Sequence, residues 1–476
     1  MPVYTKLYGA FVLVLFVLYF GGIGLLRQNE KRITVYSQAL LFLAGLVFYA
    51  YAGVLFVPVL LYECAAAWSF GLFLAKKTTG VKKGIAVFCL LLPLLLFKYL
   101  RYLLTLTGIL SGTFFLPLGI SFFTLQSITY VLAVAGGELP VEKNPLPVAL
   151  FVSFFPSISS GPILRAKQML PQFGRVRPFD YETVTDGLKV TTWGLFQKLV
   201  IADNLVPYIV SVKGAQDASG TAQLLAAVLY SFQLYLDFSG YSCIVIGTAQ
   251  LFGFRIPQNF DHPYLSESVS EFWHRWHISF SSFLRDYVYF PLGGSRVREG
   301  RIYCNLLVTF LISGIWHGNG MTFLLWGLLH GLFICLDRLW KKRSVLLTFL
   351  LVTVAWVFFA AESVKDALLT IASFVRIPGE LLQLVAQMKG GGGGTWERLA
   401  TAWNRLVFPE ADVFLLQPVV FLLLFCGSSL FTKNHPGLPW IRGQKPLLRW
   451  SCYLLLIGAV LFFHAAAPVN FIYNQF

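Results

Sequence analysis

The chain has 476 residues and a formal net charge of +15, and 57% of its residues are hydrophobic while only 12% are charged. Soluble domains carry roughly 25% charged residues, so this composition excludes an ordinary water-soluble enzyme and predicts a protein that faces lipid. The lysines and arginines occur in short clusters between apolar runs, as they do in the loops of membrane proteins, which argues against a nucleic-acid-binding protein.

In chain order, basic clusters interrupt a series of apolar runs, several of which reach the ~20 residues that a helix needs to cross a bilayer. Long runs rather than short alternating ones favour helices over a barrel. The sequence therefore predicts an all-α polytopic membrane protein. The expected spans are residues 8–26, 36–52, 54–75, 84–104, 114–134, 146–162, 187–211, 221–250, 303–320, 322–338, 345–361, 413–431 and 448–466.

Two stretches do not fit a simple span. Phe151–Pro162 contains prolines and serines that interrupt a helix. Irregular backbone at membrane depth is tolerated only around a protein-lined cavity, so we expect this stretch to be re-entrant or half-buried. Residues 256–300 are too polar to cross as a span, and we expect an amphipathic or re-entrant segment there.

Residues 362–412 are expected to form a loop on the outer side of the membrane. The run Gly390–Gly394 has no following Lys-Ser/Thr, so it predicts a flexible linker rather than a phosphate-binding loop. An amphipathic, leucine-rich stretch flanks this linker. No boundary to a soluble domain is visible, and we expect a single integral-membrane domain over residues 1–476 with a catalytic core at about 115–340.

His317 is the most informative candidate for chemistry. It follows the apolar or small-residue run Leu306–Trp316, and an ionisable group at membrane depth is a functional candidate because it is expensive to place there. Imidazole titrates near neutral pH, which suits a base that takes a proton from an alcohol. His330, in a later apolar run, is expected to be a packing residue.

A second cluster of polar and aromatic residues occupies positions 230–294. His274 and His277 are three residues apart in it, so they would be neighbours on a helix. His277 is the second candidate for chemistry, with a packing role as the alternative. His274, between a tryptophan and an arginine, is expected at an interface.

The same cluster contains charged candidates. Arg285 is expected to pair with Asp286, with contact to an acyl donor as the alternative. Asp237 is expected to be a buried hydrogen-bond anchor, with a place in the site as the alternative. A metal site is not expected, because an HExxH pattern is absent and the seven cysteines are scattered without a CxxC pair.

The absence of a GxSxG elbow argues against a serine nucleophile. Direct attack by a substrate hydroxyl on a thioester needs less apparatus. It requires a histidine base near the alcohol, a group that polarises the carbonyl and a water-poor pocket. The histidines described above fit the first of these requirements.

Several motifs distributed along the chain carry a family resemblance. They are Pro117–Gln126, Phe155–Ile163, Gly194–Asp203, Asp237–Ser242, Glu271–Ser279 with Arg285–Tyr287 and Pro291–Gly294, Trp316–Gly318 and Phe471–Phe476. Over nearly the full length, these motifs resemble those of the membrane-bound O-acyltransferase (MBOAT) family, in its bacterial alginate O-acetyltransferase-like branch.

The resemblance implies a ring of about 11–13 transmembrane and re-entrant helices around a central tunnel, each span following the length rule for a bilayer. It implies that His317 is the catalytic histidine and His277 the second histidine of the core. Acetyl-CoA would be the acyl donor, with no permanently bound cofactor and no metal. The candidates for supporting or substrate-binding roles are Trp316, Trp276, Arg285, Asp237 and His274.

The resemblance also implies an O-acetyltransferase in the bacterial cytoplasmic (inner) membrane, with the polysaccharide O-acetylation role of the branch. Its partners would be a cytoplasmic acyl thioester, an exported polysaccharide acceptor and an extracytoplasmic esterase-like protein. The chain departs from the branch at Ala133–Gly137, where D-V-Y-R-G is typical, and at Phe358–Ala361, where F-F-R-A is typical. These departures concern contacts with a partner or acceptor more than the acyl chemistry.

Two alternatives remain open. One is a D-alanyl transferase for teichoic acids, whose donor is a carrier-protein thioester; Pro291–Gly294 and Phe471–Phe476 favour the polysaccharide branch over it. The other is a transporter or flippase, which also uses broken segments and polar groups at the midplane. The sequence shows neither repeat symmetry between its halves nor a charged pathway, which counts against transport.

Overall fold

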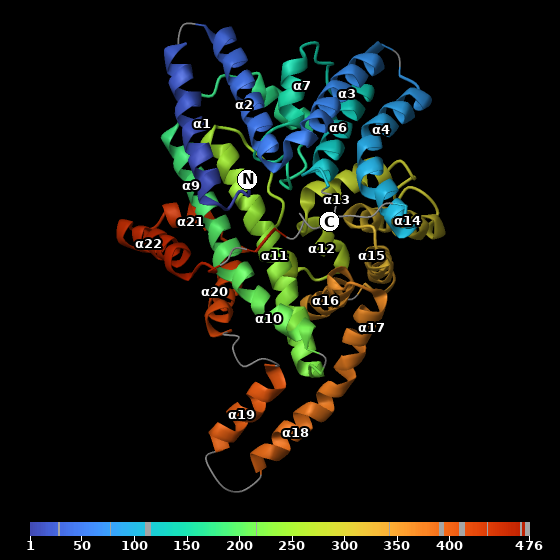
Figure 1. Cartoon of the computed structure of the whole chain (residues 1–476), viewed down its shortest axis with the longest axis vertical. Coiled ribbons are helices and arrows are strands. Elements are labelled where there is room, and N and C mark those ends of the chain that lie inside the picture. The colour runs from blue at the N-terminus through green and yellow to red at the C-terminus, as the bar shows by residue number, and fades with distance from the viewer. Residues whose placement is uncertain are drawn as a thin grey trace. The chain divides into compact units, whose positions relative to one another are not determined.

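The computed structural model describes residues 1–26, 29–76, 78–109, 116–215, 217–341, 343–389, 395–408, 415–435, 437–466 and 469–471. These residues form helices and connecting turns without a strand (Figure 1). Seven helices among them are long and apolar enough to cross a membrane, which confirms the predicted all-α polytopic fold. They are Lys6–Leu25, Glu30–Lys76, Gly80–Leu106, Tyr181–Gly214, Met321–Trp340, Val364–Gln387 and Pro446–Phe463.

The chain contacts divide the protein into two compact units. Among the described residues, the first comprises residues 1–195 and 240–259, and the second comprises residues 196–239 and 260–471. The candidate site residues all belong to the second unit. A single domain over residues 1–476 stays a prediction.

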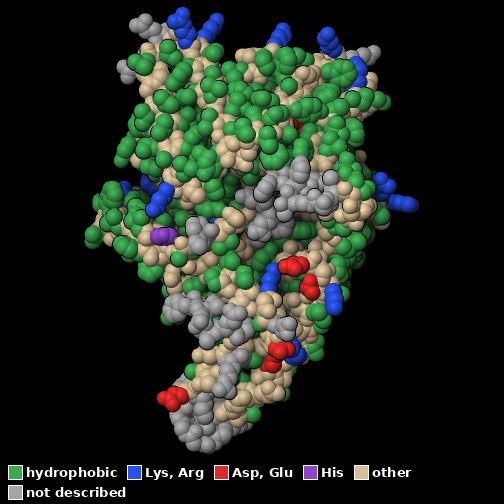
Figure 2. Space-filling model, viewed as in Figure 1, with side chains coloured by type: hydrophobic (Ala, Val, Ile, Leu, Met, Phe, Trp, Pro, Cys, Tyr) green, Lys and Arg blue, Asp and Glu red, His purple; other side chains and the backbone are tan. Residues whose placement is uncertain are grey.

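The first unit holds the N-terminal helices, in which α3 packs against α4, α6 and α7. Hydroxyl and amide side chains cap several helices; Asn29 Oδ1, for example, accepts the Arg32 N–H at 3.0 Å before α2. Lysine and arginine side chains gather at the edge where α1 joins α2 and α3 joins α4, above a largely hydrophobic surface (Figure 2). The elements are α1 (Lys6–Leu25), α2 (Glu30–Gly53), η1 (Val54–Phe56), α3 (Val57–Lys76), α4 (Gly80–Leu94), η2 (Leu95–Leu100), α5 (Arg101–Leu106), α6 (Ile120–Ala135), α7 (Pro145–Val152), α8 (Ala166–Phe173) and α9 (Tyr181–Leu195).

The stretch after α7 is irregular, as the prolines and serines of Phe151–Pro162 predict. Residues 153–164 are nevertheless all buried. Side chains satisfy part of its backbone, since Gln126 Nε2 donates to the Phe151 carbonyl and the Thr129 hydroxyl donates to the Leu164 carbonyl. Irregular backbone in a membrane protein needs this cover of protein atoms.

The second unit contains the remaining elements. Helix α11 begins in this unit and its last residues, from Gly240, belong to the first. The elements are η3 (Phe196–Ala202), α10 (Asp203–Gly214), α11 (Gly220–Leu251), η4 (Pro263–Leu265), α12 (Val269–Arg275), α13 (Ile278–Leu284), η5 (Arg285–Tyr289), α14 (Glu299–His317), α15 (Met321–Trp340), α16 (Val345–Ala360), α17 (Val364–Ser373), η6 (Phe374–Arg376), α18 (Ile377–Lys389), α19 (Thr395–Val407), α20 (Leu416–Thr432), α21 (Gly437–Arg442) and α22 (Pro446–Phe463).

The segment 256–300 consists of short pieces, η4, α12, α13 and η5, separated by turns. None of these pieces has the length of a membrane span, which agrees with the prediction that this polar segment does not cross as a simple helix. α12 packs against α15 and α16, and α13 continues into η5. This arrangement places the polar residues of the segment beside the long apolar helices.

The segment 362–412 differs from the loop that the sequence predicts. Its described residues are mainly helical, in α17, α18 and α19, and Val364–Gln387 has the length and apolar character of a span. The Ser363 side chain caps α17 by accepting the Asp366 N–H at 3.1 Å, and the leucine-rich stretch continues the helix. The amphipathic pattern therefore forms helices rather than a connector. Gly390–Gly394 lies outside the described residues.

Candidate functional site

A close pair of helices places His317 next to Trp326. His317 is the last residue of α14, and Trp326 lies in α15. Glycines allow the approach, because a Cβ on Gly314 or on Gly327 would collide with a backbone carbonyl of the facing helix. The Trp326 ring stands edge-on to the His317 imidazole, with ring centroids 4.8 Å apart. His317 is 2% exposed, so this contact is enclosed by protein.

His277 lies in a turn, so it and His274 do not share one helix, and the condition for their being helical neighbours is not met. α12 ends at Arg275, and His277 has φ +43° and precedes α13. A positive φ is uncommon for a residue with a side chain and marks a sharp change of direction. The turn exposes His274 and buries His277 completely. Burial lowers the pKa of His277 to about 3, so its imidazole is neutral near pH 7.

Two aromatic rings connect the histidines. Phe280 stacks on Trp316 with centroids 4.3 Å apart. The His277 ring lies 5.1 Å from Phe280 and 6.1 Å from Trp316. The His317 ring lies 5.4 Å from Phe280 and 4.8 Å from Trp316. The structure thus brings His277 and His317 together around the Phe280–Trp316 pair.

His330 belongs to the same enclosed region. It is fully buried in α15, and its Nδ1 accepts the indole N–H of Trp273 at 3.1 Å. Its ring centroid lies 5.0 Å from those of Trp273 and Trp326. The ring of Trp326 therefore lies in contact with both His330 and His317.

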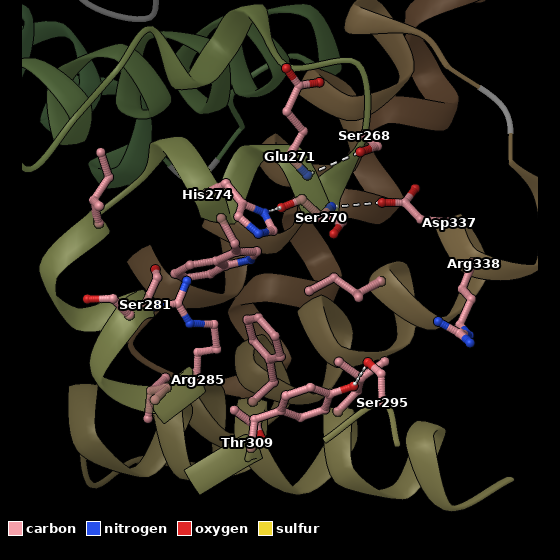
Figure 3. A pocket seen from close by; sticks show the side chains of 18 of the residues that line it. Ser268, Ser270, Glu271, His274, Ser281, Arg285, Ser295, Thr309, Asp337 and Arg338 are labelled. Atoms are coloured by element: carbon pink, nitrogen blue, oxygen red, sulfur yellow. Dashed lines mark hydrogen bonds between the residues drawn. The ribbon is translucent and has the colours of Figure 1, made fainter. Parts of the chain in front are cut away.

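A pocket whose lining includes several charged side chains borders Trp273. It encloses about 720 Å³ and is lined by residues of α12, α13, η5, α14 and α15 (Figure 3). Its cationic side chains are Arg285, Arg338 and Arg343, and His274 also faces it. Trp273 is shared, because it lines this pocket and donates its N–H to His330.

Two of the predicted residues, Arg285 and His274, line this pocket. Arg285 Nε pairs with Asp286 Oδ1 at 2.9 Å, which confirms the predicted ion pair, and Arg285 also lines the pocket. His274 Nδ1 lies 2.7 Å from the carbonyl oxygen of Ser270. Acidic groups are present as well, since the Asp337 carboxylate accepts the Ser270 N–H at 2.9 Å.

Asp237 lies in a buried charge cluster rather than in the pocket. Lys198 Nζ lies 2.7 Å from Asp237 Oδ1 and 2.8 Å from Asp203 Oδ1, and all three side chains are fully buried. The lysine also donates to the Val469 carbonyl at 2.9 Å. The next residue, Phe238, stands edge-on to His277 at 4.7 Å. Asp237 is thus a buried, ion-paired residue next to Phe238, and its role as an anchor stays a prediction.

Trp276 immediately precedes His277, and its ring is part of an aromatic cluster. It lies 5.0 Å from Trp356 and 5.3 Å from Phe272. Its side chain is 1% exposed. Trp276 therefore holds the turn at His277 by packing.

Lys198, Phe280 and Trp326 are residues of the site region that the sequence reasoning did not single out. Lys198 had a usable signal, because a lysine inside an apolar run needs a buried partner. Phe280 and Trp326 had none, since aromatic residues in apolar runs are ordinary packing residues. Among the described residues, no group of three or more His, Cys, Asp and Glu side chains has the arrangement of a metal site.

Comparison with known proteins finds similarity over nearly the whole chain. The model of the MBOAT, membrane-bound O-acyltransferase family, matches residues 137–358. The peptidoglycan O-acetyltransferase of Helicobacter pylori is 32% identical over 98% of this chain and 96% of that protein. The probable alginate O-acetylase AlgI of Pseudomonas putida is 32% identical over 95% of this chain and 97% of that protein. The teichoic acid D-alanyltransferase of Bacillus subtilis is 29% identical over 47% of this chain and 60% of that protein.

Proposed function

Because the chain belongs to the membrane-bound O-acyltransferase family and is a multi-pass membrane O-acyltransferase, we propose that it moves an acetyl group from acetyl-CoA to a hydroxyl of an exported cell-surface polysaccharide. The relatives that match almost end to end are named for acetyl transfer to peptidoglycan and alginate. The proposed location is the bacterial cytoplasmic membrane. An extracytoplasmic esterase-like protein is the proposed relay to the polymer.

Similarity to a D-alanyltransferase supports a second candidate, D-alanyl transfer from a carrier-protein thioester. That similarity covers 47% of the chain, whereas the similarity to the acetylases of Helicobacter pylori and Pseudomonas putida covers 98% and 95%. Acetyl transfer is therefore the preferred hypothesis. A transporter or flippase is set aside, because the relatives over the whole chain are acyltransferases.

His317 is the proposed general base. Its enclosed imidazole takes the proton of the acceptor hydroxyl as the oxygen attacks the thioester carbonyl carbon, and it then gives that proton to the departing sulfur. The new C–O bond replaces the C–S bond, so the products are an ester and a free thiol. The observation that carries this role is the contact of His317 with Trp316, Phe280 and Trp326 in a region with almost no solvent exposure.

His277 is the proposed second histidine of the reaction. It is neutral because burial lowers the pKa of its imidazole, so one ring nitrogen donates a hydrogen bond and the other accepts. Such a group can orient an alcohol without carrying charge into a low-dielectric region. The aromatic rings around both histidines exclude water, which would otherwise compete with the acceptor hydroxyl for the thioester.

The pocket beside Trp273 is the proposed donor site. Arginine side chains suit phosphate groups because the guanidinium is always charged and presents several N–H donors. Arg285, Arg338 and Arg343 offer this chemistry at the pocket wall. Coenzyme A carries phosphates at one end and the thioester at the other. Trp273 connects the two regions, because it lines this pocket and also bonds to His330.

The first experiment offers labelled acetyl-CoA to inverted membrane vesicles that carry the protein together with its native polymer and partner proteins. We expect wild-type vesicles to release coenzyme A thiol and to place label in the polymer or in the relay protein. His317→Ala should reduce both signals by at least ~100-fold, the usual scale for general acid–base catalysis. His464→Ala, at an exposed histidine after α22, is the matched control and should retain activity.

The outcomes separate the candidates. Full transfer by a His317→Ala protein that is present at normal amounts contradicts the proposed base. If wild-type vesicles use a carrier-protein thioester and do not use acetyl-CoA, D-alanyl transfer replaces acetyl transfer as the proposed function.

A further inference from the structure

We propose that the N–H groups of Trp326 and His330 bind the carbonyl oxygen of the acyl thioester while the acyl group is transferred. This inference rests on the proposed function, and it assigns the group that polarises the carbonyl. Histidine base catalysis alone leaves the developing negative charge on that oxygen uncompensated. Preorganised N–H donors in a water-poor region are the usual solution to this problem.

The starting observation is a set of buried donors without acceptors. Trp326 and His330 are both 0% exposed. Within the described part of the chain, neither the indole Nε1 of Trp326 nor Nε2 of His330 has a hydrogen-bond partner. Buried polar groups in native proteins are nearly always hydrogen-bonded, so each exception needs an explanation. An acceptor supplied by the substrate explains both.

The tautomer of His330 follows from its other nitrogen. Nδ1 accepts the N–H of Trp273 at 3.1 Å, so Nδ1 carries no proton. In a neutral imidazole the proton must then be on Nε2, which makes Nε2 a donor. Trp273 therefore orients His330 and sets its polarity. The two atoms that lack partners, on Trp326 and His330, are thus both donors and both suited to an oxygen.

The position of the donors suits the reaction. Trp326 and His330 are four residues apart on α15, so they share one face of the helix. The Trp326 ring centroid lies 4.8 Å from that of His317 and 5.0 Å from that of His330. The Trp326 ring, which carries one of the two donors, is thus in direct contact with the proposed base.

The step can be written with these groups in place. The acceptor oxygen bonds to the carbonyl carbon while its proton passes to His317, and the carbonyl electron pair moves onto the oxygen. Trp326 and His330 hold that oxygen through their N–H groups. When the C=O bond re-forms, the C–S bond breaks and the sulfur takes the proton from His317. The enzyme ends the cycle in its starting protonation state.

The test replaces the indole N–H while keeping an aromatic ring. We expect Trp326→Phe to lower kcat for acetyl transfer from acetyl-CoA by ~100-fold, the usual effect of losing one oxyanion donor, with KM for acetyl-CoA within about threefold of wild type. The control is Trp356→Phe. Trp356 stacks on Trp326 at 5.6 Å and its N–H also lacks a described partner, but it lies one ring farther from His317. The kcat of Trp356→Phe should stay within about fivefold of wild type, because its N–H group is not next to the proposed base.

A second measurement separates carbonyl polarisation from packing. Fluoroacetyl-CoA has a more electrophilic carbonyl than acetyl-CoA and is only slightly larger. Its reaction should therefore depend less on the N–H groups of Trp326 and His330. With this substrate, Trp326→Phe should recover most of the rate that it loses with acetyl-CoA. The inference would be overturned if Trp326→Phe lost the same factor in kcat with acetyl-CoA and with fluoroacetyl-CoA. It would also be overturned if Trp356→Phe lost as much kcat as Trp326→Phe. Either result would assign Trp326 a packing role.

Failure of the inference differs from failure of the proposed function. An active wild type beside an equally active Trp326→Phe protein rejects the oxygen-binding role alone. A wild type that does not use acetyl-CoA rejects the proposed function and this inference with it.

Discussion

A single buried lysine pairs with two carboxylates beside the site. Lys198 contacts Asp203, Asp237 and the carbonyl of Val469, so it links η3, α10, α11 and the segment after α22. Phe471, two residues beyond Val469, packs at 5.8 Å against Phe238 and is fully buried. Because Phe238 contacts His277, the charge cluster supports the wall of the site.

Removal of this lysine should be severe. In Lys198→Met, two carboxylates remain buried without their cation, and breaking a buried pair typically costs ~3–5 kcal/mol. We expect a clear fall in Tm for the detergent-solubilised protein. Lys189→Met is the control, because Lys189 pairs with Asp186 at 3.2 Å at a half-buried position and such pairs contribute roughly 1 kcal/mol or less. Similar Tm values for the two variants would contradict the structural role of Lys198.

At the residue scale, the sequence predicted burial correctly for ionisable side chains that stand in apolar runs. His317 and Asp237 stand in apolar runs, and the structure buries both. The sequence did not show the relation of His274 and His277, because spacing assumes a continuous helix and the chain turns sharply at His277. Spacing alone does not reveal such a turn.

At the scale of elements, the contact of α14 with α15 determines the distance between His317 and Trp326. Glycine is needed at this contact because the backbones approach too closely for a side chain. Gly327 is the tightest example, since a Cβ there would collide with the Phe310 carbonyl and lie 3.1 Å from Gly314 Cα. Small residues at helix contacts are characteristic of membrane proteins.

A methyl group at this position should separate the two helices. We expect Gly327→Ala to lower stability by about 1–3 kcal/mol, the scale of overpacking, and to reduce acyl transfer at the same time. Both are measured in purified protein, by thermal unfolding and by thiol release. Gly427→Ala in α20 is the control, because nothing lies within 4 Å of the added Cβ. Unchanged activity in a stable Gly327→Ala protein would show that the helix contact does not control the site.

The elements themselves were predictable to different degrees. Long apolar runs predicted the main helices, and the prolines of Phe151–Pro162 predicted the irregular stretch after α7. The sequence did not predict the helices at 364–389 and 395–407, because the glycine run between them is typical of a flexible linker. The helices form there because leucines recur on one face and Ser363 provides a cap.

At the scale of the whole molecule, charged side chains distinguish the pocket from the hydrophobic outer surface. Hydrophobic side chains are widespread on the surface in view, whereas the pocket lining also includes arginines, serines, His274 and the carboxylates Glu271 and Asp337 (Figures 2 and 3). Charged side chains at a pocket of a membrane protein suit a charged substrate better than lipid. This observation supports the choice of donor site.

The charge on the donor provides the test. Loss of one arginine–phosphate contact should raise KM for acetyl-CoA about tenfold in Arg338→Ala and leave kcat unchanged, because a charge-assisted hydrogen bond contributes roughly 1.5 kcal/mol or more. Acetyl-pantetheine, which lacks the phosphates, should react equally well with both proteins. Arg449→Ala, outside the pocket lining, is the control. A normal KM in Arg338→Ala would place the donor phosphates elsewhere.

The sequence by itself determined the class of the protein and its main chemical candidates. Apolar run length specifies membrane helices, and a histidine in such a run stands out because burying an ionisable group is costly. Only the tertiary structure decided which side chains meet. His277 and His317 share the Phe280–Trp316 pair, and Trp326 reaches His317, because turns and glycine contacts bring distant segments together. Those contacts depend on packing between segments, which a one-dimensional pattern of hydrophobicity does not specify.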